Sequence, residues 1–264
     1  MITLDLEKLA CATRCPLKEL PHFFSLKDRS KVGLLYILKI MERSDRARVI
    51  HAKEWRNVLT SVILRSAIDT MLTTLGLSVI GLQKKSLLIF ACHMQTCSGY
   101  GLAGLVIAAI TEAVEVVISD GNPQVVDYIQ RNIDANSGAF GATRVSSMTL
   151  HWDQEEISNI SNAFDVIIAS DCTFFKEFHN GLARIIRFLL KKEGPSEAIF
   201  LSPKRGNSLD KFLETIKQNA LSFSVTENYN AEVWKHHQAF MHGKDSWPSY
   251  EKDHCYPLLV RITI

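Results

Sequence analysis

Apolar runs and amphipathic repeats alternate through the second half of the chain. The predicted strands are short apolar runs, either continuous or alternating with polar residues: 87–91, 116–120, 145–150, 164–171, 198–202, 221–225 and 256–264. The predicted helices repeat apolar side chains at helical spacing: 105–110, 123–136, 178–189 and 208–216. Strands that alternate with helices in this way predict an α/β layered fold. We expect the last two strands to form a hairpin at one edge of the sheet.

The ends of these helices carry residues that commonly begin or terminate helices. Asn122 suits the N-cap of the second helix, whose first residue is Pro123, and Asn207 suits the N-cap of the fourth. Gly138 is expected as the C-cap glycine of the second helix. Lys191, near the end of the third helix, suits the negative end of the helix dipole.

Residues 1–95 differ in pattern from residues 96–264. They contain helix-like runs at 33–41 and 54–75, but neither the alternation of strands and helices nor a glycine turn. We therefore divide the chain into a helical N-terminal extension, to which no role is assigned, and a second domain of residues 96–264.

Composition excludes several classes of protein. With 47% hydrophobic and 22% charged residues, the chain has the make-up of an ordinary globular protein. A net charge of +2, without concentrated stripes of Lys and Arg, argues against nucleic-acid binding. The most apolar region, 59–82, is interrupted by Arg65 and Asp69 and does not suit a membrane-spanning helix. We expect a soluble monomer in the cytoplasm, with the nucleus as a second location.

Six cysteines are scattered along the chain: Cys11, Cys15, Cys92, Cys97, Cys172 and Cys255. None belongs to a paired C-x-x-C framework and no signal peptide precedes them, so we expect reduced thiols. Cys92, His93 and Cys97 lack the second pair of ligands that a structural zinc site needs, and no metal is expected.

A glycine-rich turn, 98–104, leads into the first predicted helix. Glycines such as Gly99 and Gly101 permit positive φ and let a ligand approach the backbone. The start of the helix offers free N–H groups and the positive end of its dipole. Because Gly-x-Gly also occurs in plain tight turns, the motif alone does not separate a binding loop from a structural one.

Two carboxylates stand at the ends of predicted buried strands. Asp120 ends one of them, where a carboxylate can accept both ribose hydroxyls of a nucleoside. The alternative is a carboxylate that serves the start of the next helix, which is weaker because Asn122 and Pro123 already suit that position. Asp171 ends another strand in the same way.

These residues resemble the class I, seven-strand S-adenosylmethionine-dependent methyltransferases. More narrowly, residues 98–264 resemble the calmodulin-lysine N-methyltransferase family of the lysine-methylating branch, through separated stretches: 98–105, 119–122, 150–153, 169–174, 202–207, 227–229 and 254–259. The resemblance implies a Rossmann-like sheet of seven strands with helices on both faces. It also implies S-adenosyl-L-methionine as the cofactor.

The resemblance implies a cofactor-binding set: Ser98, Gly99, Gly101, Asp120, Asn122, Trp152 and Ser170. Within this set, Gly99 and Gly101 are expected to border the methionine part of the cofactor, and Asp120 to hold the ribose. Trp152 is expected to flank the adenine, with a position in the core as the alternative. Ser170 is expected beside the sulfonium.

Asp171 and Phe174 are the catalytic residues that the resemblance implies, in a D-x-x-F motif beside the lysine to be methylated. A lysine amine must be neutral to accept a methyl group, whereas its pKa of about 10.4 keeps it charged near neutral pH. Asp171 can orient the ammonium and accept its proton through water, and the Phe174 ring can attract the methylated cation. The alternative for Asp171 is a cap of the following helix. No nucleophile is needed, so Cys172 is expected to be a packed thiol.

Calmodulin is the protein substrate that the resemblance implies, with a lysine of another protein as the alternative. Because calmodulin is acidic, we expect Lys204 and Arg205 to lie at the rim of the site and to steer it electrostatically. The alternative is a pair of charges that only solvates a loop.

The chain departs from the family's pattern ahead of residue 98. Gln95, Thr96 and Cys97 stand where the family normally has Glu-Leu-Gly, and residues 1–95 contain no Trp-Pro-Ser-Glu-like motif. A non-catalytic interaction protein with a degenerate first motif therefore stays open. So does a Rossmann-type dehydrogenase, although the late strand pair and the D-x-x-F motif argue against it.

Overall fold

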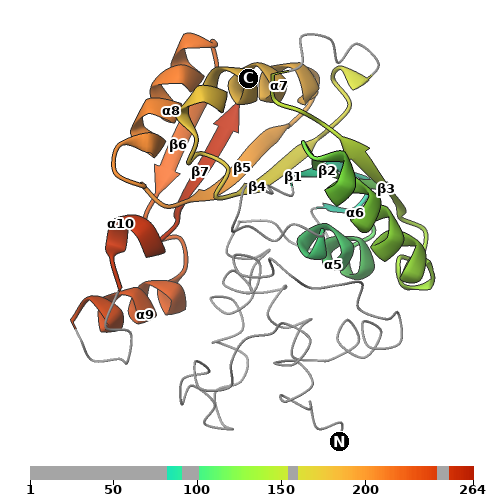
Figure 1. The fold of residues 1–264 in the computed structure, drawn as a ribbon, viewed down its shortest axis with the longest axis horizontal. Coiled ribbons are helices and arrows are strands. Elements are labelled where there is room, and N and C mark those ends of the chain that lie inside the picture. The colour runs from blue at the N-terminus through green and yellow to red at the C-terminus, as the bar shows by residue number, and fades with distance from the viewer. Residues whose placement is uncertain (1–81, 91–100, 154–159, 243–249) are drawn as a thin grey trace, which may run out of the picture.

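A computed structural model describes residues 82–90, 101–153, 160–242 and 250–264 of the chain. Residues 1–81 of the predicted extension (1–95) and the predicted features at 91–100 lie outside these residues. Residues 86–90, also assigned to the extension, instead form a strand of the sheet, so the domain begins before residue 96. The described part is built around a seven-stranded sheet with the strand order β3-β2-β1-β4-β5-β7-β6 (Figure 1). The predicted seven-strand sheet is therefore confirmed.

The strands of this sheet are β1 (Ser86–Phe90), β2 (Glu115–Asp120), β3 (Arg144–Thr149), β4 (Val166–Ser170), β5 (Glu197–Ser202), β6 (Ser222–Thr226) and β7 (Leu258–Thr263). The pairs from β3 through β5 are parallel, whereas β7 is antiparallel to both of its neighbours, β5 and β6. The carboxyl ends of β1, β2, β4 and β5 therefore lie at one edge of the sheet. Ligands of open α/β sheets bind outside this edge.

The described helices are α5 (Leu102–Ile110), α6 (Pro123–Ala135), α7 (His179–Leu189), α8 (Ser208–Gln218), α9 (Ala231–Met241) and α10 (Lys252–Cys255). Helices α5 and α6 cover one face of the sheet, and α7 and α8 cover the other (Figure 1). The predicted cover of both faces is confirmed. Within the described ranges, no helix combines the length and the apolar character needed to cross a membrane.

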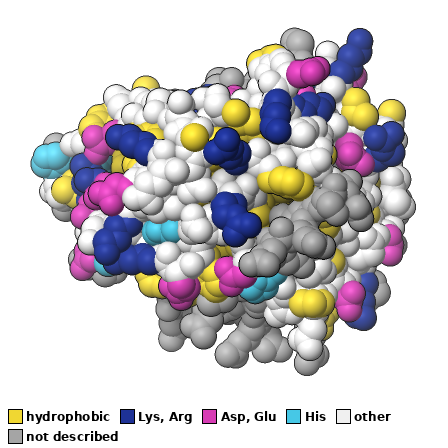
Figure 2. Space-filling view, turned by 90° about the horizontal axis from the view of Figure 1, so that it is seen from above, with side chains coloured by type: hydrophobic (Ala, Val, Ile, Leu, Met, Phe, Trp, Pro, Cys, Tyr) yellow, Lys and Arg dark blue, Asp and Glu magenta, His cyan; other side chains and the backbone are white. Residues whose placement is uncertain are grey.

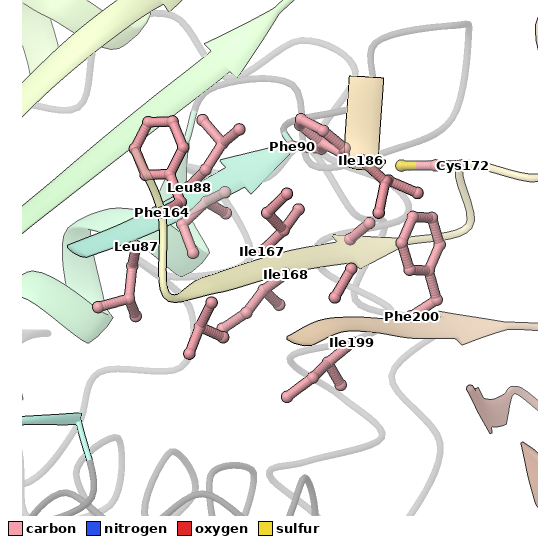
Figure 3. Close-up of a cluster of buried hydrophobic side chains, with 14 of the residues drawn as sticks. Leu87, Leu88, Phe90, Phe164, Ile167, Ile168, Cys172, Ile186, Ile199 and Phe200 are labelled. Carbon is pink, nitrogen blue, oxygen red and sulfur yellow. The ribbon is translucent and has the colours of Figure 1, made fainter. Parts of the chain in front are cut away.

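The central strands are buried on both faces, as their continuous apolar runs predicted. Leu87, Leu88, Ile167, Ile199 and Phe200 from β1, β4 and β5 are 0% exposed and belong to one cluster (Figure 3). Truncating a side chain of this kind in a packed core costs roughly 2–5 kcal/mol. The core therefore holds the carboxyl ends of these three strands firmly side by side.

The start of α6 is confirmed and its end is corrected. The Asn122 side chain accepts a hydrogen bond from the Gln124 N–H at 2.9 Å, as an N-cap residue does. Helix α6 ends at Ala135 with Asn136 as its C-cap, and Gly138 lies in a following 3-10 turn rather than at the C-cap. Asn136 replaces the predicted glycine because its side-chain amide donates to the Asn132 carbonyl oxygen at 2.7 Å and closes the last turn.

Two further helix ends differ from prediction. Asn207 occupies the N-cap position of α8, but its side-chain oxygen accepts a hydrogen bond from Lys176 Nζ at 2.7 Å instead of capping the helix. Lys191 follows α7, but its Nζ donates to Asp165 Oδ2 at 2.8 Å rather than to the helix end. Hydrogen bonds that involve a charged group are roughly twice as strong as neutral ones, which favours these partners.

The last two strands pair at one edge of the sheet, as predicted, but not as a hairpin. Strands β6 and β7 pair antiparallel, but residues 227–257 with α9 and α10 separate them, and β7 lies between β5 and β6. Burial explains this order, because Val260 and Ile262 of β7 are 0% exposed whereas most of β6 is exposed. An apolar strand gains most from an interior position, and a polar strand tolerates the edge.

Candidate active site

Gly101 begins α5 at the carboxyl edge of the sheet. It is the N-cap, with a left-handed φ of 79°. A Cβ added there would lie 3.1 Å from Ile118 and 3.2 Å from Ile129, so both the backbone and the packing favour glycine. As a glycine, Gly101 provides no side-chain cap of its own, so the first N–H groups of α5 suit a polar or anionic ligand. The other predicted residues of this turn, Ser98 and Gly99, lie outside the described residues.

Asp120 ends β2, as predicted, and is 4% exposed. Its Oδ1 accepts a hydrogen bond from the Asn122 N–H at 2.7 Å, and its carbonyl oxygen accepts one from the Leu150 N–H at 2.9 Å. The carboxylate therefore supports the start of α6, which was its alternative role. A carboxylate has about four acceptor positions, so this bond is compatible with further bonds from ribose hydroxyls.

Trp152 follows β3 and packs against the core. Its ring centroid lies 6.1 Å from that of Phe90, the last residue of β1, and 6.1 Å from that of Phe178. A Cβ added at Gly181 would lie 2.1 Å from the Trp152 carbonyl oxygen, so this turn packs directly on α7. The packing supports the alternative of a core position. Contact between Trp152 and an adenine stays a prediction.

Asp171 directly follows Ser170, the last residue of β4, and has a left-handed φ of 51°. Its N–H donates to the Leu201 carbonyl oxygen of β5 at 2.9 Å. Helix α7 begins eight positions later at His179, with Phe178 as its N-cap. Asp171 therefore does not cap that helix, and this alternative is wrong.

Arg205, in the turn after β5, binds Asp171, a contact that was not predicted. Its Nη2 lies 2.5 Å from Asp171 Oδ2 and its Nε lies 3.4 Å from Oδ1, with the two side chains 20% and 14% exposed. The Arg205 guanidinium carbon lies 5.7 Å from the centroid of the Phe174 ring, and Phe174 is 50% exposed. We call these three residues the Asp171 cluster. The Arg205 charge is thus paired within the cluster, and the attraction of an acidic partner by Arg205 stays a prediction.

The order of the strands could have predicted the contact between Asp171 and Arg205. β4 and β5 are parallel neighbours, so the turns that follow them meet at the same edge of the sheet. Asp171 stands in the first of these turns and Arg205 in the second. A carboxylate and a guanidinium placed after adjacent parallel strands could have revealed the contact.

Two buried side chains hold the loop that carries Phe174. The Thr173 carbonyl oxygen lies 2.9 Å from Nε2 of His179 and accepts a hydrogen bond from Oγ of Ser208 at 2.6 Å. Because a carbonyl oxygen can only accept, Nε2 of His179 carries the proton. Burial lowers the pKa of His179, which favours the neutral ring. Helices α7 and α8 thus position the loop through residues that sequence reasoning missed.

A group of ring-bearing side chains adjoins the Asp171 cluster through α10: Tyr229, Trp234, His237, Tyr250 and Tyr256. The rings of His237 and Tyr256 stack at 4.0 Å, and His237 Nδ1 lies 2.6 Å from the Tyr250 hydroxyl. Burial raises the pKa of Tyr256 to about 12. The Asp253 carbonyl oxygen of α10 accepts a hydrogen bond from the Arg205 N–H at 2.8 Å, so this group supports the turn with Arg205.

Cys172, in the same loop, is 2% exposed and lies among core side chains (Figure 3). Its Sγ donates to the Ser170 carbonyl oxygen at 3.3 Å. This burial agrees with the expected packed thiol. Over the described ranges, no group of three or more His, Cys, Asp or Glu residues could hold a metal ion.

Charges of both signs are mixed on the face shown in Figure 2, where Lys and Arg side chains lie among Asp and Glu. Lys204, beside Arg205, is partly exposed. It therefore remains a candidate for the electrostatic attraction of an acidic partner.

The described part of the chain has the Rossmann-like fold of the class I methyltransferases, with a glycine at the start of α5 and carboxylates after β2 and β4. Residues 85–219 match the lysine methyltransferase family. The chain belongs to that family.

Two known proteins illustrate the similarity. A calmodulin-lysine N-methyltransferase of Arabidopsis thaliana is 63% identical over 166 residues, which cover 63% of this chain and 55% of that protein. The chain thus spans about half the length of this curated relative. A branched-chain polyamine synthase from Thermus thermophilus, solved with N4-aminopropylspermidine and 5′-methylthioadenosine, matches with a TM-score of 0.50 and 15% identity over 75% of this chain and 55% of that chain. The second similarity shows a shared fold.

Proposed function

We propose that the chain transfers methyl groups from S-adenosyl-L-methionine to the side-chain amine of a lysine in calmodulin. The observation that carries this proposal is the 63% identity, over 166 residues, to a calmodulin-lysine N-methyltransferase. Membership in the lysine methyltransferase family supports it. Two carboxylates lie at the carboxyl edge of the sheet: Asp120 suits the cofactor, and Asp171 suits the lysine amine.

The residues at the ends of β2 and β4 fit S-adenosylmethionine. Asp120 is a buried carboxylate at a strand end, which suits a pair of ribose hydroxyls. Gly101 itself places no side chain at the start of α5, and Asn122 and Ser170 lie at the same edge. The proposed set also includes Ser98, Gly99 and Trp152. When bound, the cofactor supplies a methyl group on a sulfonium.

Asp171 and Phe174 are the proposed catalytic residues. Asp171 orients the incoming ammonium and takes up its proton through water, because the amine must be neutral to react. The exposed Phe174 ring provides an aromatic wall for the lysine and its methylated product. Together, Asp171 and Phe174 would hold the neutral amine in line with the sulfonium methyl group, to which its nitrogen would bond while the sulfur would leave with the electron pair.

We propose a catalytic domain that comprises the predicted residues 96–264 together with β1, since β1 lies in the middle of the same sheet, and that acts as a monomer in the cytoplasm and the nucleus, without nucleic acid or membrane. The net charge of +2 supports the absence of a nucleic-acid partner. Sedimentation equilibrium of the full chain and imaging of a fluorescent fusion in cells test these points.

The test of the function is incubation of the full chain with labelled S-adenosylmethionine and purified calmodulin. Lys-to-Arg variants of calmodulin identify the target lysine, and unrelated acidic proteins serve as controls. Calorimetry with S-adenosylhomocysteine measures the cofactor site independently of the substrate. Label on calmodulin that one Lys-to-Arg change removes is the expected result.

Other outcomes would redirect the proposal. Label on unrelated proteins but not on calmodulin would overturn the substrate and leave the methyltransferase activity standing. No label, with a known methyltransferase active in parallel, would favour a non-catalytic protein. The departure at Gln95 and Cys97 from the family's first motif makes this last outcome a specific alternative.

A further inference from the structure

We propose that Arg205 is a positioning residue of the site, which orients Asp171 and places a fixed positive charge beside the lysine amine. This inference rests on the lysine methylation proposed above. It goes beyond that proposal because it gives Arg205 a defined role in the reaction of the neutral amine.

The two side chains meet because of the backbone that carries them. Asp171 and Arg205 follow the parallel neighbours β4 and β5, and both are left-handed, with φ values of 51° and 48°. Left-handed backbone is unfavourable for a residue with a Cβ and persists where the surrounding bonds hold it. Here the Asp171 N–H donates to Leu201 and the Arg205 N–H donates to Asp253, at 2.9 and 2.8 Å.

The contact between the side chains uses two points of the guanidinium. Nη2 and Nε face different oxygens of the Asp171 carboxylate, at 2.5 and 3.4 Å. A planar fork of this kind fixes the plane of a carboxylate, which a lysine ammonium does not do. Since both side chains are mostly buried, solvent screens the contact only partly. The Asp171 carboxylate is therefore oriented before any substrate arrives.

Phe174 connects this pair to the place of the substrate. The guanidinium lies 5.7 Å from the ring centroid, within the range of a cation–π contact, and half of the Phe174 side chain remains exposed. A lysine that packs on the exposed part of this ring lies close to both charges. Arg205 disfavours a second cation there, and so favours the neutral amine that accepts the methyl group.

Other charged groups border the cluster. The charged or titratable side chains on the neighbouring elements include Lys176, Glu177, Lys204, Asp210, Lys211, Glu227, Glu251, Lys252, Asp253 and His254. Lys252 pairs with Glu227 at 2.5 Å, and Lys176 binds Asn207. Arg205, in contrast, is hydrogen-bonded to Asp171 itself. Removal of the Arg205 charge should therefore change the electrostatics of the Asp171 cluster more than removal of any of the bordering charges.

The experiment compares Arg205→Met and Arg205→Lys with Arg261→Met in the full chain. Arg261 is a matched control because it forms an equally short pair with Glu197, at 2.5 Å and 28% and 25% exposed, where β5 begins. For each protein, kcat is measured with calmodulin from pH 6 to 9, together with S-adenosylhomocysteine affinity and thermal unfolding.

We expect Arg205→Met to lower kcat at neutral pH by about 100-fold, since misplacement of a reacting group by about 1 Å can have an effect of this size. The acidic limb of its profile of kcat against pH should move to higher pH, because the bound amine loses its proton less readily. Arg205→Lys should lower kcat less and leave that limb in place. S-adenosylhomocysteine affinity should stay within about twofold in both variants, and Arg261→Met should retain normal kcat.

Each contrary outcome has a distinct meaning. An unchanged kcat in Arg205→Met, or a fall without any movement of the acidic limb, would overturn the role of Arg205 alone. A fall in kcat matched by Arg261→Met would show a general effect on stability and would overturn it too. If the unmodified chain binds S-adenosylhomocysteine but labels no lysine, the proposed function fails, and with it this inference.

Discussion

At the scale of single residues, the site combines strained backbone with an ion pair between side chains. Asp171 and Arg205 both adopt left-handed conformations, which are unfavourable by roughly 1–2 kcal/mol each. Their mutual ion pair and their backbone bonds to β5 and α10 hold them there. Asp120, by contrast, lies at the end of a regular strand and needs no unusual backbone. The two carboxylates are thus presented to the same edge by different means.

Replacing Asp120 with Asn should weaken S-adenosylhomocysteine binding by about 10- to 100-fold. The reason is that hydrogen bonds to a charged acceptor contribute about 1.5–3 kcal/mol, more than those to a neutral amide. Calorimetry on the purified variant measures the change. Asp165→Asn is the matched control, because Asp165 is a partly buried carboxylate bound to Lys191 and to the Ser86 N–H at the opposite end of the strands. Equal affinities in Asp120→Asn and the unmodified chain would refute the assignment.

At the scale of the helix, the packing of α5 on β2 depends on Gly104. A Cβ added there would lie 2.5 Å from Cγ1 and 2.7 Å from Cδ1 of Ile118, which is 0% exposed and cannot move aside easily. Gly104→Ala should therefore lower the free energy of unfolding by about 1–3 kcal/mol, as overpacked cores do. Denaturant titration measures the loss. Gly138→Ala meets nothing within 4 Å and should leave stability nearly unchanged; a similar loss in both variants would contradict this account of α5.

The start of α7 should make the fold sensitive to mild acid. Burial lowers the pKa of His179 below its ordinary value of 6.5. Above pH 6.5 the His179 ring is neutral in both the folded and the unfolded chain. As the pH decreases below 6.5, the unfolded chain binds the proton first, so the free energy of unfolding decreases. His179→Gln keeps a donor for the Thr173 carbonyl oxygen but cannot titrate. As the pH decreases below 6.5, the free energy of unfolding of this variant should decrease less steeply than that of the unmodified chain. The two slopes should differ by up to about 1.4 kcal/mol per pH unit. An unchanged slope would exclude His179 as a source of this sensitivity.

At the scale of elements, the apolar patterns predicted most of the sheet but not all of the helices. Continuous runs such as β4 and β5 were recognisable because both of their faces are buried. Helix α9 was not predicted, although Val233, His237 and Phe240 have helical spacing and are buried. The periodicity was hidden because a histidine counts as polar, whereas this histidine is buried, stacks on the Tyr256 ring and contacts the tilted ring of Trp234.

The parts that sequence reasoning missed depend on neighbours that are distant in the chain. The place of β7 between β5 and β6 and the bond from α10 to Arg205 are set by packing, not by a local pattern. The same holds for the pair of Asp171 and Arg205. Asp120 was predictable because the position of a carboxylate at a strand end is a local feature.

At the scale of the whole molecule, the candidate site is assembled from segments that are far apart in the sequence. Its described residues follow β2, β4 and β5, begin α5 and rest on α10 (Figure 1). These elements meet because the core aligns the carboxyl ends of the parallel strands. The late strand β7 contributes no side chain to the Asp171 cluster, yet it pairs β5 with β6 and so completes the sheet behind that cluster.

A chain that ends after Pro257 should therefore fail to fold, although it keeps every proposed site residue. It would lose β7, whose buried residues are Leu258, Leu259, Val260 and Ile262. Burial of each such side chain contributes about 1.5–3 kcal/mol, so the loss approaches the whole stability of about 5–15 kcal/mol of a typical domain. Deletion of Ile264 alone is the control, because this residue is 49% exposed and follows the strand. The chain that ends after Pro257 should lose its soluble yield, its native circular dichroism spectrum and its S-adenosylhomocysteine binding. The chain that lacks only Ile264 should keep all three. Cooperative unfolding of the shorter chain would show instead that β5 and β6 can close the sheet without β7.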